Sequence, residues 1–227
     1  NELMREVIFS DKARLKQLLN IYQSSFEARI IHRGNYYATT HSGRNLSSTL
    51  KLIEEWYGLE QLGYVRRLNS LPEEGLEKLQ LDFAAITARI FAIDNLDITF
   101  TGDPHTDFSY SHRSLIDGLP TVSAGQVQQK DEVAIEGGFS KNAFILASDV
   151  SFNALSFLTV RSDHDDSASL QVLASLLSLA FLLREVREKG GAYGARAGYS
   201  GATGLFSFSS YRDPNIARTY DAFERAM

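Results

Sequence analysis

The sequence of 227 residues predicts an α/β fold of the α+β type, in which antiparallel sheets are backed by helices. Apolar residues recur at helical spacing through much of the N-terminal half of the chain. Short segments nearer the C-terminus instead alternate apolar and polar residues, as strands with one buried face do. The length and the 44% hydrophobic content allow one large domain or two partial domains with a real core.

The first helix is expected to begin at Ser10 and Asp11, whose side chains favour a helix N-terminus. Apolar residues then follow at helical spacing: Leu15, Leu18, Leu19, Tyr22 and Phe26. The pattern breaks near Gly34, and two shorter helices are expected over residues 36–46 and 48–56.

Pro72 predicts the start of the next helix, because proline is favoured in the first turn, and apolar spacing continues to Ile90. Residues 96–102 alternate apolar and polar side chains and predict a half-buried strand. The segment from Asp103 to Gly138 contains glycines, a proline and a polar tract, and therefore predicts a linker with one short helix.

Two strands are expected over residues 142–147 and 154–160, and a third over residues 205–211, where the alternation is strict. Between them, a helix is expected from Ser167 to about residue 189. Its first seventeen residues carry no charge, but they include four serines and fall short of the ~20 apolar residues of a membrane span. We therefore expect a buried helix. Pro214 is expected to open a last helix that runs through Tyr220 and Phe223.

The composition excludes several classes of function. The formal net charge is −5, with 23 basic and 28 acidic residues and no basic run, which argues against nucleic acid as a partner. The chain contains no cysteine, so disulfides, cysteine nucleophiles and cysteine-ligated metals are excluded. No nucleophile elbow of the form Gly-x-Ser-x-Gly is present.

The histidines do not predict a metal site. They are His32, His41, His105, His112 and His164, and no two have the spacing that places imidazoles on one helix face. A site could be assembled around His105 and His112, or around His164 with the two aspartates that follow it. Solvated loop residues are the better interpretation of both groups.

A glycine-rich turn carries the most specific pattern in the chain. Residues 184–194 end a helix in basic residues, turn at Gly190 and Gly191, and present Tyr193 on the emerging strand. Arg187 and Tyr193 are both hydrogen-bond donors and could bind a peptide carbonyl or a developing oxyanion. The structural alternative is that Arg187 balances the helix dipole while the ring of Tyr193 packs.

The two longest motifs are Arg187-Glu-Lys-Gly-Gly-Ala-Tyr-Gly194 and Phe206-Ser-Phe-Ser-Ser-Tyr-Arg-Asp-Pro-Asn215. They resemble the C-terminal half of the presequence-protease and falcilysin-like branch of the pitrilysin/insulinase family of zinc peptidases. Residues 10–14 and 36–38 are similar, more weakly, to the third domain of that family. The resemblance implies that residues 1–103 end the third domain, 104–138 form a linker, and 139–227 begin the fourth domain.

In that family, a His-x-x-Glu-His motif in the first domain holds zinc, and two halves of the protein close around an unfolded peptide. The resemblance implies that Arg187 and Tyr193 contact the substrate carbonyl and oxyanion, with Gly190, Gly191 and Gly194 in the substrate-binding turn. This sequence lacks His-x-x-Glu-His, so the zinc ligands are expected outside this chain, which should be inactive alone and bind no zinc.

The expected partners are unfolded or short peptides and the N-terminal catalytic half of the same protein, without nucleic acid or membrane. The expected compartment is the cytoplasm of a bacterium or the matrix of an organelle. The chain begins with Asn1 and ends at Met227 in a helical pattern, so we expect a fragment with a truncated fourth domain. Two alternatives stay open: a non-catalytic structural or substrate-binding subunit of the same fold, and an unrelated binding domain.

Overall fold

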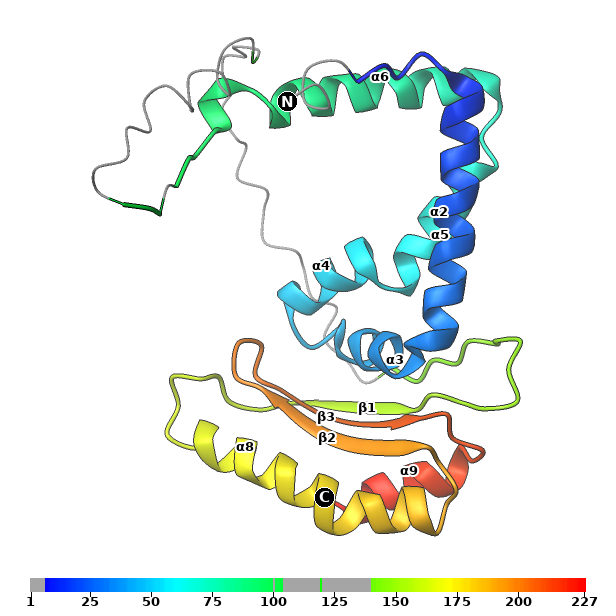
Figure 1. The fold of residues 1–227 in the computed structure, drawn as a ribbon. Coiled ribbons are helices and arrows are strands. Elements are labelled where there is room, and N and C mark those ends of the chain that lie inside the picture. Colours follow the sequence, from blue (N-terminus) through cyan, green and yellow to red (C-terminus); the bar gives the residue numbers. More distant parts are fainter. Residues whose placement is uncertain (1–6, 100, 104–118, 120–139) are drawn as a thin grey trace. The chain divides into compact units, whose positions relative to one another are not determined.

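The computed structural model describes residues 7–99, 101–103, 119 and 140–227 (Figure 1). The chain forms two compact units, each made from separate stretches of sequence. The first comprises Asn1–Ile21 and Arg67–Gln129, and the second comprises Tyr22–Arg66 and Lys130–Met227. Helices combined with an antiparallel sheet confirm the predicted fold class.

The first unit packs the N-terminal turns of α2 (Lys12–His32) near α6 (Glu73–Ile90). Its buried residues are Leu19, Leu76 and Leu79, which lie on the apolar faces that the sequence predicts for both helices. The Asp11 carboxylate accepts a hydrogen bond from the Arg14 amide at 2.8 Å, which confirms Asp11 as a helix N-terminal residue. Both predicted helices are therefore confirmed.

The second unit contains a layer of helices, α3 (Gly34–Gly43), α4 (Ser48–Tyr57) and most of α5 (Leu59–Asn69). The helices α3 and α4 confirm the predictions over residues 36–46 and 48–56. The helix α5 was not predicted, although Leu59, Leu62, Val65 and Leu68 recur at helical spacing. Tyr37 of α3 and Leu62 of α5 form a buried cluster with Phe26 and Ile30 of α2.

A three-stranded antiparallel sheet forms the centre of the second unit. Its strands are β1 (Ala154–Leu158), β2 (Gly194–Ser200) and β3 (Leu205–Tyr211), in the order β1-β3-β2. Figure 1 shows α3 over one face of this sheet and the helices α8 (Ser167–Leu176) and α9 (Ala217–Arg225) over the other.

The alternation in β3 separates the two faces as the sequence predicts. Phe206, Phe208 and Ser210 are buried toward α8 and α9, and the rings of Phe208 and Phe223 stack with centroids 5.5 Å apart. Residues of the other face lie toward α3, where the Ser42 and Ser156 hydroxyls are hydrogen bonded. Burying large aromatic side chains in this way is a major source of stability.

The helix predicted from Ser167 forms as α8 and continues as the π-helical segment η2 (Leu177–Glu188). Leu182 and Val186 are almost completely buried against the sheet. On the opposite side lie four exposed apolar residues, Val172, Leu173, Leu176 and Leu179. Ser167–Glu188 is long and apolar enough to cross a membrane by length and composition alone, a test that core helices of globular proteins also pass. The predicted burial is therefore correct for one face of the helix and wrong for the other.

Two predicted strands do not form. Residues 96–99 are irregular and follow a short 3₁₀ turn at Ile93–Asn95, and residues 142–147 are irregular and mostly exposed. Alternation makes a strand only where a neighbouring strand supplies hydrogen bonds, and none of the described residues pairs with either segment. The last helix begins at Ala217, after a turn at Pro214. Most of the predicted linker, residues 104–118 and 120–138, lies outside the described residues.

Candidate functional site

The predicted site residues lie at the turn that joins η2 to β2. The turn closes through two hydrogen bonds, from the Gly191 amide to the Arg187 carbonyl at 2.8 Å and from the Ala192 amide to the Val186 carbonyl at 3.2 Å. This arrangement resembles a Schellman helix end, widened by one residue because η2 is π-helical. It brings the backbones of Arg187 and Tyr193 into one short, closed turn.

The turn explains why glycines stand at Gly190 and Gly191. Gly191 has a φ of +81°, a conformation that L side chains rarely adopt. A Cβ at position 190 would lie 2.4 Å from the Val186 carbonyl oxygen. Gly194 differs, because a Cβ there would meet nothing within 4 Å. Its glycine is therefore not required by the fold.

Tyr193 is 70% exposed, so its side chain lies at the surface and not in the core. Its amide donates to the Arg212 carbonyl at 3.2 Å, and its ring meets that of Tyr211 edge-on, with centroids 5.8 Å apart. One edge of the ring is thus held while the rest of the side chain faces outward. A donor fixed at its base and free at its tip suits recognition of another molecule.

The charges around the turn are unevenly paired. Glu185 binds the Lys189 ammonium at 2.6 Å and the Arg225 guanidinium at 3.2 Å, and its pKa is lowered, first by Lys189. Arg187 is exposed, and no carboxylate of the described residues lies within 4 Å of it. The guanidinium of Arg187 is therefore available to another molecule, whereas Lys189 and Arg225 are both paired with Glu185.

A buried polar network beneath the turn was missed by sequence reasoning. The side-chain amide of Asn215 donates to the Gly190 carbonyl at 2.5 Å, and its backbone amide donates to the Asp213 carboxylate at 2.9 Å. Asp213 is fully buried and also accepts from Thr219 at 2.7 Å and Asn153 at 3.3 Å. The Asp-Pro-Asn sequence after β3 was the available indication, because such residues favour side-chain-stabilised turns.

A second buried group, also missed, lies in the helical layer. The His41 imidazole Nδ1 and the Glu54 carboxylate are 2.7 Å apart, and the Glu54 side chain is completely buried. The same carboxylate accepts the Leu59 amide at 2.9 Å. The two partners are thirteen positions apart in the sequence, which is not a spacing typical of metal-binding histidines, so no local pattern indicates the pair.

The other histidine groups do not form a site in the described residues. His164 lies 3.6 Å from the Asp166 carboxylate, and both side chains are largely exposed. His105 and His112 lie outside the described residues. Within the described part of the chain, no three His, Asp or Glu side chains gather closely enough to hold a metal ion.

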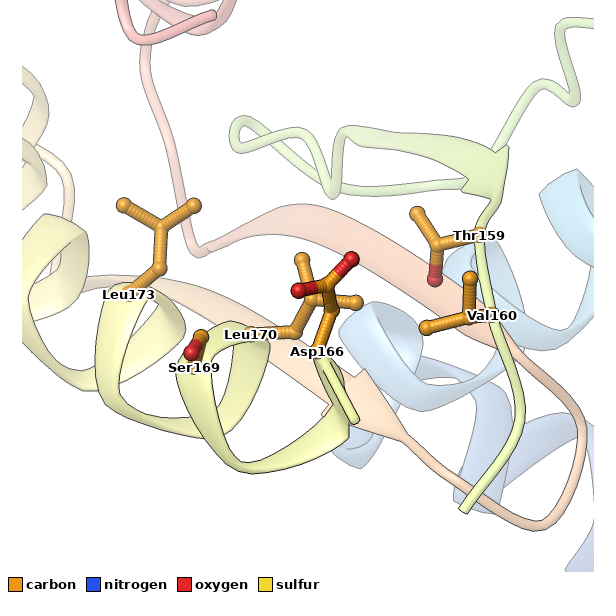
Figure 2. Close-up of a pocket in the computed structure, with 6 residues that line it drawn as sticks. All are labelled: Thr159, Val160, Asp166, Ser169, Leu170 and Leu173. Atoms are coloured by element: carbon orange, nitrogen blue, oxygen red, sulfur yellow. The ribbon is translucent and has the colours of Figure 1, made fainter. Parts of the chain in front are cut away.

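A separate cavity of about 460 Å³ lies between the end of β1 and the first turns of α8 (Figure 2). Its lining consists of Thr159, Val160, Asp166, Ser169, Leu170 and Leu173. Figure 2 shows Asp166 and Leu170 between Leu173 on one side and Val160 on the other. None of the predicted site residues lines this cavity, which is mostly apolar.

Comparisons with known proteins match both ends of the chain. Residues 1–68 match the family model of a peptidase-associated domain, and residues 141–227 match "PreP C-terminal domain". The mitochondrial presequence protease of Eremothecium gossypii is 33% identical over 100% of this chain and 24% of its own length. The mitochondrial presequence protease of Drosophila melanogaster is 31% identical over 98% of this chain and 21% of its own length. That of Saccharomyces cerevisiae is 29% identical over 96% of this chain and 22% of its own length. The chain thus spans about a quarter of the length of these relatives.

Proposed function

Because this chain belongs to the presequence-protease branch of the pitrilysin/insulinase family, we propose that it is the substrate-binding part of a zinc-dependent endopeptidase that degrades short, unstructured peptides. The observation that carries this proposal is the turn at Gly190 and Gly191. It holds the exposed phenol of Tyr193 and the exposed guanidinium of Arg187 at one corner of the sheet. Both side chains can donate hydrogen bonds to a peptide.

In the proposed reaction, these two donors bind the carbonyl oxygen of the peptide bond that is cut. Their hydrogen bonds strengthen as that oxygen becomes negatively charged, which lowers the energy of the transition state. The closed turn supports this role, because its hydrogen bonds fix the backbone from which both donors extend. Gly190, Gly191 and Gly194 would allow the peptide backbone to approach the turn closely.

The described residues do not fit a zinc site, since no cluster of metal-ligating side chains is found among them. We therefore assign the zinc ligands to the N-terminal half of the full-length protein. Zinc in such a peptidase supplies an activated water and polarises the substrate carbonyl. No step of the mechanism proposed for this chain depends on a metal that it binds itself.

The domain division follows from the same family relationship. We assign residues 1–103 to the third peptidase domain, 104–138 to a linker and 139–227 to the fourth. The match over residues 141–227 begins close to the proposed start of the fourth domain, which supports that boundary. Residues 69–140, which neither model matches, contain the proposed linker together with residues 69–103 of the proposed third domain. The two compact units do not coincide with these proposed domains, because Tyr22–Arg66 belongs to the same unit as Lys130–Met227.

The proposed partners are the N-terminal catalytic half and the peptides enclosed between the halves. The three relatives are named as mitochondrial, which favours an organellar matrix if the source is eukaryotic, and a bacterial source would favour the cytoplasm. Cleavage of a quenched unstructured peptide by the full-length protein tests the proposal. If the full-length sequence lacks His-x-x-Glu-His and the protein binds peptides without cutting them, a non-catalytic substrate-binding role replaces the enzyme.

A further inference from the structure

Arg212 has a backbone conformation that is unusual for arginine. Its φ is +48°, and no other non-glycine residue of the described ranges has a positive φ. Glycine, asparagine and aspartate are the usual residues in this left-handed region. Residues held in such conformations are concentrated at binding and catalytic sites, where the surrounding structure fixes them.

The surrounding structure does fix Arg212 from both sides. Tyr211 precedes it as the last residue of β3, paired with Gly194. Asp213 follows it, with its backbone paired to Ser151 through hydrogen bonds of 2.7 and 2.9 Å and its carboxylate buried in the network beneath the turn. The Arg212 carbonyl then accepts the Tyr193 amide, which ties the strained residue directly to the proposed site.

The side chain of Arg212 points into solvent beside two tyrosines. Its guanidinium carbon lies 5.6 Å from the centre of the Tyr211 ring, and that ring contacts Tyr193. A guanidinium over an aromatic face keeps its charge and its hydrogen-bond donors while its orientation is restricted. No carboxylate of the described residues lies within 4 Å of it, since the neighbouring Asp213 carboxylate is taken up by other donors.

A second arginine extends this surface within the same compact unit. The Tyr211 hydroxyl donates to the His32 carbonyl at 3.2 Å, at the end of α2. The next residue, Arg33, is exposed, and its guanidinium lies 5.1 Å from the centre of the Tyr36 ring. Within the described part of the chain, Arg33 has no carboxylate within 4 Å either. Arg33, Tyr36, Tyr193, Tyr211 and Arg212 together are called the arginine–tyrosine surface.

We propose that the arginine–tyrosine surface is a carboxylate-binding subsite, in which Arg212, assisted by Arg33, binds a carboxylate of the peptide substrate. An arginine fork binds a carboxylate through two parallel hydrogen bonds, and neither arginine has such a partner among the described residues. The carboxylate could belong to the peptide C-terminus or to an Asp or Glu side chain. This inference rests on the proposed peptide-binding function and adds a specificity for negative charge next to Tyr193.

Equilibrium binding to the metal-depleted full-length protein tests the proposal independently of cleavage. Fluorescence anisotropy would be measured with one unstructured peptide in four forms. The C-terminus is either a free acid or an amide, and one internal residue is either Glu or Gln. A charge-assisted contact should make the form with the bound carboxylate about ten- to one-hundredfold tighter than its neutral counterpart. The form that shows the preference identifies the source of the carboxylate.

The variants separate a binding role from a structural one. Arg212→Gln and Arg33→Gln remove the charge, and each should reduce the preference, with Arg212→Gln having the larger effect. Arg212→Lys keeps the charge but loses the fork, and it should retain only part of the preference. Arg161→Gln is the matched control, because Arg161 is an exposed arginine beside Gly204 at the other end of β3. It should leave the preference unchanged.

Arg212→Gly gives the sharpest contrast, because glycine suits the left-handed conformation while the guanidinium is lost. We expect it to melt at the same temperature as the wild type or higher, and to bind the charged peptide as weakly as Arg212→Gln. The proposal would be overturned if the wild-type protein bound the charged and neutral peptides equally tightly. It would also be overturned if the double variant Arg33→Gln, Arg212→Gln kept the preference for the charged peptide. A preference for charge without cleavage by the metal-loaded protein would refute the proposed enzyme and leave this subsite standing.

Discussion

The side-chain amide of Asn215 donates to the Gly190 carbonyl at 2.5 Å, so a residue beyond β3 holds the turn that precedes β2. The backbone amide of Asn215 in turn donates a hydrogen bond to the Asp213 carboxylate, and the Asn153 side chain donates one to the Asn215 carbonyl. The position of Tyr193 thus depends on a buried network that touches neither its ring nor its hydroxyl.

Removing the Asn215 amide should loosen this turn. Asn215→Ala loses one buried hydrogen bond, and we expect it to lower the free energy of unfolding by about 1 kcal/mol. It should also reduce turnover of the full-length enzyme, with a smaller effect on melting temperature than on kcat. Arg218→Ala, at an exposed position in the first turn of α9, serves as the control. If Asn215→Ala keeps the wild-type kcat, the network has no part in positioning Tyr193.

The phenol of Tyr193 provides a direct test of the proposed oxyanion contact. Tyr193→Phe keeps the ring that meets Tyr211 and removes only the hydroxyl donor. Loss of one such donor typically costs about 10²–10³ in turnover. We expect that decrease in kcat together with an unchanged melting temperature, because the side chain is largely exposed. Wild-type turnover in a normally folded Tyr193→Phe enzyme would refute the contact.

Arg187 is expected to act on peptide binding as well as on turnover. Arg187→Lys keeps the positive charge but loses the planar fork of donors, so KM should rise and kcat should fall. Arg184→Lys, on the same helical segment and also exposed, should change neither parameter. Steady-state kinetics on a quenched peptide separates the two variants. Equal effects from both would mean that only the general charge of the helix end matters.

The glycines of the turn should respond differently to alanine. Gly191→Ala places a Cβ at a φ of +81°, and we expect a loss of about 1–2 kcal/mol in the free energy of unfolding. Gly194→Ala meets no atom within 4 Å and should be neutral or stabilising in denaturant unfolding. If Gly194→Ala nevertheless reduces peptide cleavage, substrate must approach that backbone closely.

The buried pair of His41 and Glu54 should be costly to break. The two side chains are 10% and 0% exposed, so replacing either partner leaves a polar group without its main contact. His41→Ala or Glu54→Ala should each cost about 1–3 kcal/mol in the free energy of unfolding, measured in denaturant, because each leaves a buried polar group unsatisfied. The double variant His41→Phe, Glu54→Leu should be clearly more stable than either. A double variant as unstable as the sum of the singles would mean that packing, and not the hydrogen bond between the two side chains, dominates.

Several parts of this fold could be predicted because the responsible pattern is local. The helices α2, α4 and α6 follow from apolar spacing and from N-terminal residues such as Asp11, and β3 follows from its strict alternation. The strand expected over residues 96–102 failed because strands depend on partners that lie far away in sequence. The helix α5 was missed although its pattern is also local, since apolar residues recur every three positions and two of them, Leu62 and Val65, are buried.

The candidate site likewise contains residues that a local motif predicts and contacts that only the folded chain brings together. The turn glycines, Arg187 and Tyr193 could be located from a short contiguous motif, although their roles stay predictions. The supporting contacts could not be located, because Asn215 meets Gly190 and Arg212 meets Tyr193 only after the hairpin folds. No spacing rule relates His41 to Glu54, because that pair depends on how α3 packs against α4.

The close approach of Gly34 to Phe152 links the two regions of the chain that match separate family models. A Cβ on Gly34 would stand 2.3 Å from the Phe152 ring, so a side chain at position 34 requires the ring to move or to be replaced by a smaller residue. During divergence, a larger residue at 34 would be tolerated only after the ring at 152 had been lost. The two positions should therefore vary together among homologues, and chimaeras that exchange residues 1–68 alone should inherit a steric conflict at this point wherever the incoming segment carries a side chain at 34.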